Sequence, residues 1–213
     1  MNSITRRLRD HTVEDAIRAL SAGTPAPGGG SAAAIVAAVG IALTGMMAEF
    51  TKNNPRYAPV RAQVHNLLRE NKKLSRRSLR LMESDARVFL RLNEVFRLPR
   101  SDPRRKRLLQ QRLRQAAAVP AEVCAVCAAA AEICCATARI GNRHLLSDAG
   151  CAIEFLLSAA RAAGLNVAVN ARLIDDRRLA TAQRRLTENA VRRIEADRKI
   201  ILRLMNTHGS STS

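Results

Sequence analysis

Apolar residues recur along this chain at spacings of three and four, the period of a helix with one face toward a core. The longest such stretch predicts one helix from Val60 to Phe96, and no alternation of β-branched residues lasts long enough to predict a strand. The apolar stripe of this helix comprises Val60, Val64, Leu67, Leu74, Leu81, Met82, Phe89, Leu92 and Phe96. We therefore predict an all-α fold, a multihelical bundle with long helices.

Capping residues, glycines and prolines mark the ends of the other helices. Thr12 opens a capping motif, Pro120 should kink or divide a helix, and Gly141 and Gly164 should each end one. The predicted ranges are 12–22, 31–50, 60–96, 102–141, 147–163 and 178–205. These helices make one domain over residues 1–207, and we expect the tail 208–213 to be disordered.

The length of two predicted helices implies a second copy of the chain. At about 1.5 Å per residue, residues 60–96 and 178–205 span about 55 Å and about 40 Å. A globule of 213 residues is narrower than the first of these, so part of that helix must protrude. Pairing with another copy would cover the protruding part, and we expect a homodimer.

Polar residues interrupt the apolar stripe of the longest helix at Asn71, Ser75, Ser78 and Asp85. A buried polar group costs about 1–3 kcal/mol unless it is satisfied, and a buried charge costs more. Asp85 lies between Met82 and Phe89, so its carboxylate needs a partner or a ligand. Asp85 is therefore a candidate functional residue from its position alone.

A glycine-rich loop, residues 24–31 with the sequence TPAPGGGS, precedes the predicted buried helix. Gly28, Gly29 and Gly30 let a ligand approach the backbone and accept positive φ at little cost. Ser31 is a good N-cap, and the free N–H groups of a first helical turn bind anions. No Gly-Lys-Ser/Thr follows, which excludes a nucleotide P-loop. The loop is either a ligand site or a tight turn into a buried helix.

The same loop resembles the opening of the cyclodeaminase/cyclohydrolase family, whose members act on one-carbon forms of tetrahydrofolate. The resemblance covers roughly residues 10–180. Its other motifs follow in the family's order: Asp85-Ala86 with Phe89 and Leu98-Pro99, Val119-Pro120, Gly141-Asn142 with Ser147-Asp148-Ala149-Gly150, and Asn166-Val167 with Asn170 and Asp175. The resemblance implies an intertwined helical homodimer that takes a tetrahydrofolate derivative as its substrate.

The resemblance and the polar residues together define a candidate site. Asp148 and Asp85 are the catalytic candidates, with Asp148 favoured as the base. Asp148 would otherwise only support the first turn of its helix, and Asp85 would make a buried structural hydrogen bond. Asn166 and Asn170 lie four apart and would either read the edge of a pterin or cap local turns. The substrate-binding candidates are Pro27, Gly28, Gly29, Gly30, Ser31, Asn142, Ser147, Asn166 and Asn170.

This residue set suits a substrate that supplies its own electrophile, since it holds carboxylates and amides but no Ser-His-Asp arrangement. The resemblance implies a methenyltetrahydrofolate cyclohydrolase, in which water adds to the cationic carbon of 5,10-methenyltetrahydrofolate and gives 10-formyltetrahydrofolate. The alternatives are a formiminotetrahydrofolate cyclodeaminase that releases ammonia, and a non-catalytic module of the same fold that binds folate or an acidic partner. The family's lysine-rich turn is missing after Thr51, so Lys52 or Arg56 would replace it.

The net charge of +18 narrows the choice of partners. Most of the arginines can be solvated faces, and some can steer an acidic ligand such as a polyglutamylated folate. A nucleic-acid partner is disfavoured, because the cations are spread over several helices and only five aromatic residues are present for base stacking.

The cysteines and the most apolar stretch suggest structural roles. Cys124, Cys127, Cys134, Cys135 and Cys151 have no second CxxC or nearby His pair, so we expect buried core residues, no metal site and no tightly bound cofactor. Their odd number and the lack of a signal peptide fit the cytoplasm. The apolar stretch 32–48 is near the lower length limit for a membrane span, and we expect a buried core helix and no membrane.

Overall fold

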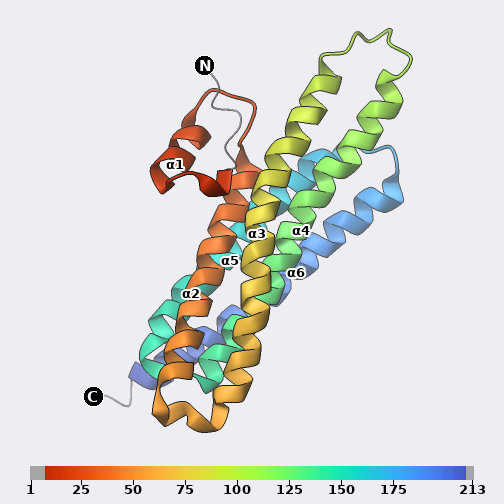
Figure 1. The fold of residues 1–213 in the computed structure, drawn as a ribbon. Coiled ribbons are helices and arrows are strands. Elements are labelled where there is room, and N and C mark those ends of the chain that lie inside the picture. Colours follow the sequence, from red (N-terminus) through yellow and green to blue (C-terminus); the bar gives the residue numbers. More distant parts are fainter. Residues whose placement is uncertain (1–7, 210–213) are drawn as a thin grey trace.

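The computed structural model describes residues 8–209, which form helices joined by short connections (Figure 1). The α-helices are α1 (Val13–Ser21), α2 (Gly29–Asn53), α3 (Arg61–Phe96), α4 (Arg105–Ile140), α5 (Leu146–Arg172) and α6 (Arg177–Gly209). Short 3₁₀ helices are η1 (Leu8–Asp10), η2 (Pro55–Val60) and η3 (Arg143–Leu145). The described residues contain no strand, and the all-α prediction is confirmed.

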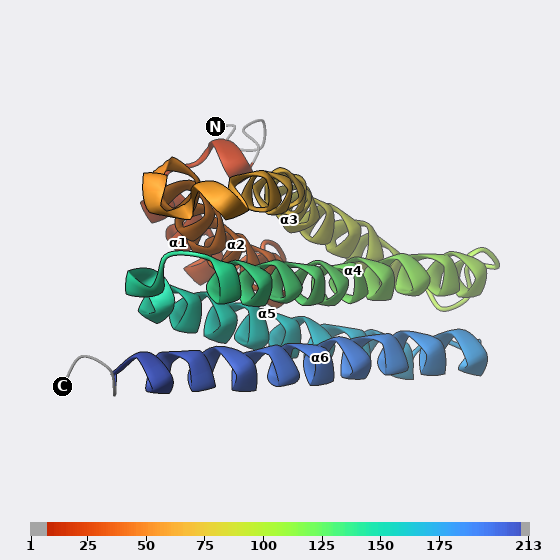
Figure 2. The same ribbon diagram turned by 90° about the horizontal axis from the view of Figure 1, so that it is seen from below.

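The long helices α2 to α6 run lengthwise beside one another. At the centre, α5 packs against α2, α4 and α6, while α4 also packs against α3 and α6. Figure 2 shows α4 and α5 between the α2–α3 pair and α6. The end of α3 and the start of α4 extend beyond the N-terminal end of α2 (Figure 1), as the length of the predicted 60–96 helix required.

Small side chains let these helices pack closely. Ala34, Ala37 and Ala160 have no exposed surface. A Cβ on Gly40 of α2 would lie 2.9 Å from the Ala152 carbonyl oxygen of α5, so this crossing requires glycine. By length and composition alone, α2, α4 and the stretch from η3 through α5 are apolar enough to cross a membrane. In the bundle they pack against one another.

Two predicted helix starts are wrong for local reasons. α2 begins at Gly29 with Gly28 at the N-cap, so Ser31 is not the cap; its side chain has partners on α3 instead. α4 begins later than predicted, because the Asp102 carboxylate accepts the Arg104 N–H at 2.8 Å and closes a turn ahead of the helix. The predicted cap at Thr12 is confirmed, since its hydroxyl accepts the N–H of Asp15 at 3.1 Å.

Two residues predicted to interrupt helices lie inside them. α4 is continuous through Pro120, and α5 is continuous through Gly164. A glycine inside a helix costs about 1 kcal/mol relative to alanine, which packing against neighbouring helices offsets. α6 also extends through His208 and Gly209, so the predicted disordered tail is wrong at these two positions. Residues 210–213 lie outside the described residues.

The buried face of α3 departs from the predicted stripe. Phe89 and Phe96 are 43% and 44% exposed, so neither belongs to the buried core, contrary to the predicted stripe. Leu68 and Val95 are buried, although the stripe omitted them. The period of an α-helix is 3.6 residues, so positions chosen at intervals of three and four drift around a helix of 36 residues.

Polar residues on the same face of α3 donate hydrogen bonds to the backbone of α2. Asn71 and Ser78 are buried as predicted. Asn71 Nδ2 donates to the Ile41 carbonyl at 2.9 Å, and Ser78 Oγ donates to the Ala34 carbonyl at 2.8 Å. Ser75 is only half-buried.

The cysteines are free thiols. Cys124, Cys127, Cys134 and Cys135 are buried as predicted, whereas Cys151 is exposed. Burial raises the pKa of Cys124 and of Cys134 to about 12, so both remain protonated at neutral pH. Among residues 8–209, no three His, Cys, Asp or Glu side chains gather as metal ligands would.

Candidate active site

The first turn of α2 surrounds the carboxyl group of Asp85 on α3. Gly30 faces it so closely that a Cβ there would lie 2.1 Å from Asp85 Oδ1. The hydroxyl of Ser31 lies 3.0 Å from Asp85 Oδ2. The N–H groups of a first helical turn have no partner within the helix, so this end of α2 favours a negative charge. The partner that Asp85 required is therefore Ser31 together with the start of α2.

The Ser31 hydroxyl has one proton and two neighbours that can accept it. Its Oγ lies 3.0 Å from the Met82 carbonyl oxygen and 3.0 Å from Asp85 Oδ2. When Asp85 is protonated, it can donate to Ser31 while Ser31 donates to Met82, and every group is satisfied. When Asp85 is ionised, Ser31 can turn its proton toward the carboxylate. Ser31 thus serves Asp85 in both protonation states.

Burial raises the pKa of Asp85 above its ordinary value. Hydrogen bonds from the side chain and the backbone of Ser31 oppose this shift without cancelling it. A carboxylate with a raised pKa is a stronger base, and it holds a proton closer to neutral pH than an exposed aspartate does. Carboxyl groups perturbed in this way are concentrated at functional sites.

Asp85 lies in the wall of a cavity of about 290 Å³. The glycine loop, α3, α4 and α5 supply the lining, which comprises Pro25, Gly28, Gly29, Gly30, Asp85, Val88, Phe89, Ala116, Val119, Leu165, Asn166, Val169 and Asn170. Apolar walls with a few converging polar groups are typical of small-molecule sites. The proline in the wall is Pro25 and not the predicted Pro27.

Asn166 and Asn170 enter this cavity from one face of α5, as their spacing predicted. Each uses its amide N–H to hold a backbone carbonyl. Asn166 Nδ2 donates to Ala162 O, and Asn170 Nδ2 donates to Ala116 O, both at 3.0 Å. An amide oxygen accepts two hydrogen bonds, so both side chains retain acceptors for a ligand.

Pro120 explains how Asn170 can bind the backbone of α4. In a regular α-helix the Ala116 carbonyl would accept the N–H of residue 120, but proline has none. Asn170 Nδ2 donates to that carbonyl instead. The proline therefore leaves α4 continuous while it fixes an asparagine of α5 in the cavity wall. The sequence marks Pro120 as a helix interruption but does not reveal this role, because the two partners are 54 positions apart.

The remaining predicted site residues lie at the opposite end of α5. Ser147 and Asp148 are in its first turn, about 27 Å along the helix from Asn166. Asn142 lies near them, and its backbone N–H donates to Thr51 Oγ1 at 3.0 Å. Within one chain, Asp148 therefore does not share a cavity with Asp85, and its catalytic role stays a prediction.

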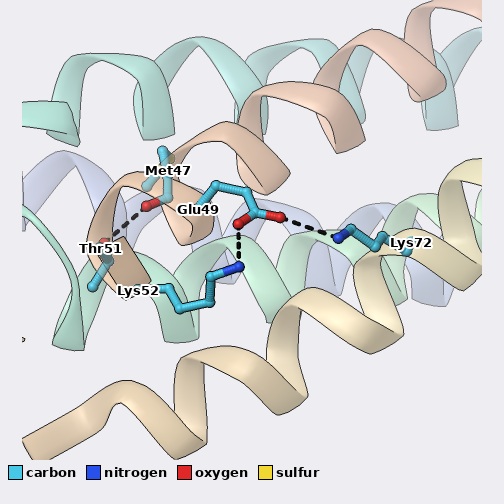
Figure 3. A network of polar contacts seen from close by, with 5 residues as sticks. All are labelled: Met47, Glu49, Thr51, Lys52 and Lys72. Carbon is cyan, nitrogen blue, oxygen red and sulfur yellow. Dashed lines mark hydrogen bonds and ion pairs between the residues drawn. The ribbon is translucent and has the colours of Figure 1, made fainter. Parts of the chain in front are cut away.

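An ion-pair network occupies the same end of the bundle as Thr51. Glu49 pairs with Lys52 and, at 3.1 Å, with Lys72 (Figure 3). Hydrogen bonds from the two lysines lower the pKa of Glu49. Lys52, one of the two predicted substitutes for the family's lysines beside Arg56, is therefore engaged with Glu49.

The apolar walls of the cavity are the part that sequence reasoning missed. They include Val88, Ala116, Val119, Leu165 and Val169. An apolar residue that lines a cavity gives the same helical pattern as one that fills a core, so the sequence carries no signal that separates the two.

Comparisons with known proteins agree with this architecture. A family model described as formiminotransferase-cyclodeaminase matches residues 12–205. A methenyltetrahydrofolate cyclohydrolase from Methylorubrum extorquens is 33% identical over 183 residues, which cover 84% of this chain and 87% of that protein. A formimidoyltransferase-cyclodeaminase from Mus musculus is 32% identical over 173 residues, which cover 79% of this chain and 32% of that protein. The chain thus spans about a third of this second relative.

A solved structure has the same fold. The crystal structure of formiminotetrahydrofolate cyclodeaminase from Thermotoga maritima matches with a TM-score of 0.87 and 22% identity, over 94% of this chain and 98% of that one. The family model covers nearly the whole chain, and the bacterial relative is more than 30% identical over most of both chains. This chain therefore belongs to the formiminotransferase-cyclodeaminase family.

Proposed function

We propose that this chain is a folate one-carbon enzyme that hydrolyses 5,10-methenyltetrahydrofolate to 10-formyltetrahydrofolate. The observation that carries the proposal is Asp85, a hydrogen-bonded carboxyl group with a raised pKa in the wall of a cavity. The similarity to a methenyltetrahydrofolate cyclohydrolase over most of both chains supports the same reaction.

The cavity suits the pterin part of this substrate. Its volume of about 290 Å³ is at the lower limit of small-molecule sites, so it fits a bicyclic ring system rather than a whole folate. The amide oxygens of Asn166 and Asn170 can accept hydrogen bonds from the N–H groups of the pterin. Val88 and Val119 provide apolar surface for its faces. The rest of the bound folate then extends out of the cavity through its mouth.

Asp85 would act as a base and then as an acid. Its carboxylate stabilises the cationic carbon and takes one proton from water as the new C–O bond forms. The neutral adduct opens when the bond from this carbon to N5 breaks, and Asp85 returns its proton to N5. The proton of the new hydroxyl group leaves to solvent through the carboxylate as the formyl C=O forms. The sum is substrate cation plus water giving 10-formyltetrahydrofolate and one proton.

Cyclodeamination of 5-formiminotetrahydrofolate is the second candidate. That reaction needs an acid to protonate the departing nitrogen, and the raised pKa of Asp85 favours a carboxyl group that holds a proton. Similarity to formimidoyltransferase-cyclodeaminases supports it as well.

The test follows the absorbance of 5,10-methenyltetrahydrofolate with purified protein. We expect hydrolysis well above the buffer rate, and we expect Asp85→Asn to lower kcat by about 10²–10⁴-fold, the usual contribution of a general base. Asp148→Asn, assayed in parallel, tests the second carboxylate. Decay no faster than buffer would reject the cyclohydrolase, and ammonia release from 5-formiminotetrahydrofolate would then test the alternative.

A measurement of stability shows whether Asp85→Asn loses activity because the catalytic base is missing or because the protein no longer folds. The folded protein holds the Asp85 proton at pH values where the unfolded chain has lost it, so this group's contribution to stability falls as pH rises through that window. Asparagine carries no such charge. We therefore expect Asp85→Asn to be at least as stable as the wild type at pH 7.

We also propose that the chain forms a homodimer through the face between α4 and α6. This face holds a groove of about 1020 Å³ whose lining includes Ala121, Ala125 and Ala129 beside glutamates and arginines. Leu186 of α6 lies in the same lining and is 63% exposed. A protruding leucine beside an alanine-lined groove is self-complementary, as a two-fold interface requires.

A further inference from the structure

A second concavity adjoins the cavity of Asp85. It lies between α5 and α6, which run beside each other (Figure 2), and has a volume of about 840 Å³. Leu165 lines both spaces. Ala162 lines the groove and accepts the hydrogen bond of Asn166, a residue of the cavity wall, at 3.0 Å. The two spaces are thus adjacent parts of one surface of α5.

The floor of this groove is apolar and its rim is cationic. Ala162, Ala168 and Val191 contribute apolar surface. The lining also holds three arginines and one carboxylate, namely Arg161, Arg184, Arg192 and Glu188. An apolar floor flanked by guanidinium groups suits a ligand with an aromatic ring and carboxylates, since arginine binds a carboxylate through two parallel hydrogen bonds.

Contacts between α5 and α6 fix where these arginines lie. Gly164 faces Thr187, with 4.0 Å between an ideal Cβ on Gly164 and Thr187 Cβ, and Arg161 pairs with Glu195 at 2.7 Å. The helices are therefore antiparallel, and Arg184, one turn before Thr187, lies toward the cavity end of the groove. No ion pair of Arg184 is found among the described residues, so its guanidinium is available to a ligand.

We propose that this groove binds the benzoylglutamate tail of the folate, with Arg184 holding a glutamate carboxylate. The proposal rests on the proposed function and deepens it, since it assigns the part of the substrate that the small cavity leaves outside. Because the two helices are antiparallel, Arg184 lies about level with residue 167 of α5, next to Asn166 in the cavity wall. The axes of packed helices are about 8–10 Å apart, a span that one benzoyl ring bridges from α5 to α6. The ring then lies over Leu165 and Ala168.

Equilibrium binding tests this assignment independently of turnover. The probes are 5-formyltetrahydrofolate and the matched 5-formyltetrahydropteroate, which lacks the glutamate, titrated by calorimetry into wild type, Arg184→Gln and Arg185→Gln. Arg185 is the control, because it is the next arginine of α6 and lies outside the groove. Both substitutions affect exposed side chains and remove one charge each.

We expect a loss of binding affinity only in Arg184→Gln and only for the probe that carries the glutamate. Arg184→Gln should weaken binding of the glutamate-bearing probe by about tenfold, the size of one charge-assisted hydrogen bond at a partly exposed site. Its binding of the pteroate probe, and both affinities of Arg185→Gln, should stay within about twofold of wild type. Equal losses in Arg184→Gln and Arg185→Gln, or equal losses for both probes, would overturn the assignment.

Turnover then separates this inference from the proposed function. Binding with the expected pattern but no hydrolysis of 5,10-methenyltetrahydrofolate would reject the cyclohydrolase and keep the tail site. Hydrolysis by wild type with no selective effect of Arg184→Gln would keep the cyclohydrolase and reject the tail site. Failure of wild type to bind either probe, together with no hydrolysis of 5,10-methenyltetrahydrofolate, would reject both.

Discussion

The three glycines of the loop differ in what they require of their neighbours. No atom lies within 4 Å of an ideal Cβ on Gly28, and one on Gly29 would meet Asn166 Nδ2 at 3.5 Å, an ordinary contact. On Gly30 it would overlap the Asp85 carboxyl group, with all three of its outer atoms closer than 3.0 Å. Only Gly30 is therefore needed to let α2 approach Asp85.

Gly30→Ala should displace Asp85, although alanine normally stabilises a helix. The overlap with Oδ1 at 2.1 Å leaves no room, so we expect a loss of about 1–3 kcal/mol in the free energy of unfolding and a fall in kcat/KM of at least about 10²-fold. Gly29→Ala should keep kcat/KM within about threefold and gain up to about 1 kcal/mol from helix propensity. Chemical denaturation and the absorbance assay measure both. Equal behaviour of the two variants would contradict the role given to Gly30.

At the scale of elements, periodicity predicted every long helix, whereas glycines and prolines led to wrong predictions of where helices end. The sequence ended one helix at 163 because Gly164 follows, but α5 has 27 residues and continues to Arg172. This error also affected the site. A helix that stopped at Gly164 would have allowed Asp148 and Asn166 to fold back on each other, while the continuous helix holds them at its two ends. Tertiary packing determines whether a helix continues through a glycine, and the local sequence carries no signal of that packing.

Pro120 illustrates the same limit and leads to a prediction. Pro120→Ala restores the N–H that the Ala116 carbonyl lacks, so Asn170 loses its anchor on α4. The gain in helix propensity is up to about 3 kcal/mol, which exceeds the free energy lost when the small apolar volume of the proline ring is removed. We therefore expect the free energy of unfolding to rise by about 1 kcal/mol. The substrate KM should rise by about tenfold, because Asn170 is no longer held at the cavity.

Asn170→Ala is the matched control for this variant. It should raise KM similarly, yet it should lower stability because the Ala116 carbonyl then lacks any partner. Denaturant unfolding together with steady-state kinetics on both variants separates the two effects. A Pro120→Ala protein with wild-type KM would show that the proline does not position Asn170.

At the scale of the whole molecule, one chain leaves large apolar side chains in solvent. Phe50, Leu165, Val169 and Leu186 are each more than half exposed. The predicted site residues also divide between the two ends of the bundle, with Asp85 at one and Asp148 at the other. Both features support the proposed homodimer, which the sequence could indicate only through helix length.

The proposed dimer face allows a direct test with Leu186→Glu. The substitution places a carboxylate against the alanine-lined groove of the second copy, so a charge is buried where apolar contact is needed. We expect wild type to elute at the mass of two chains in light scattering coupled to gel filtration, and Leu186→Glu at the mass of one. Val13→Glu, on α1 and 83% exposed, provides a control of equal charge and should remain dimeric. A monomeric wild type, or a dimeric Leu186→Glu protein, would reject this face.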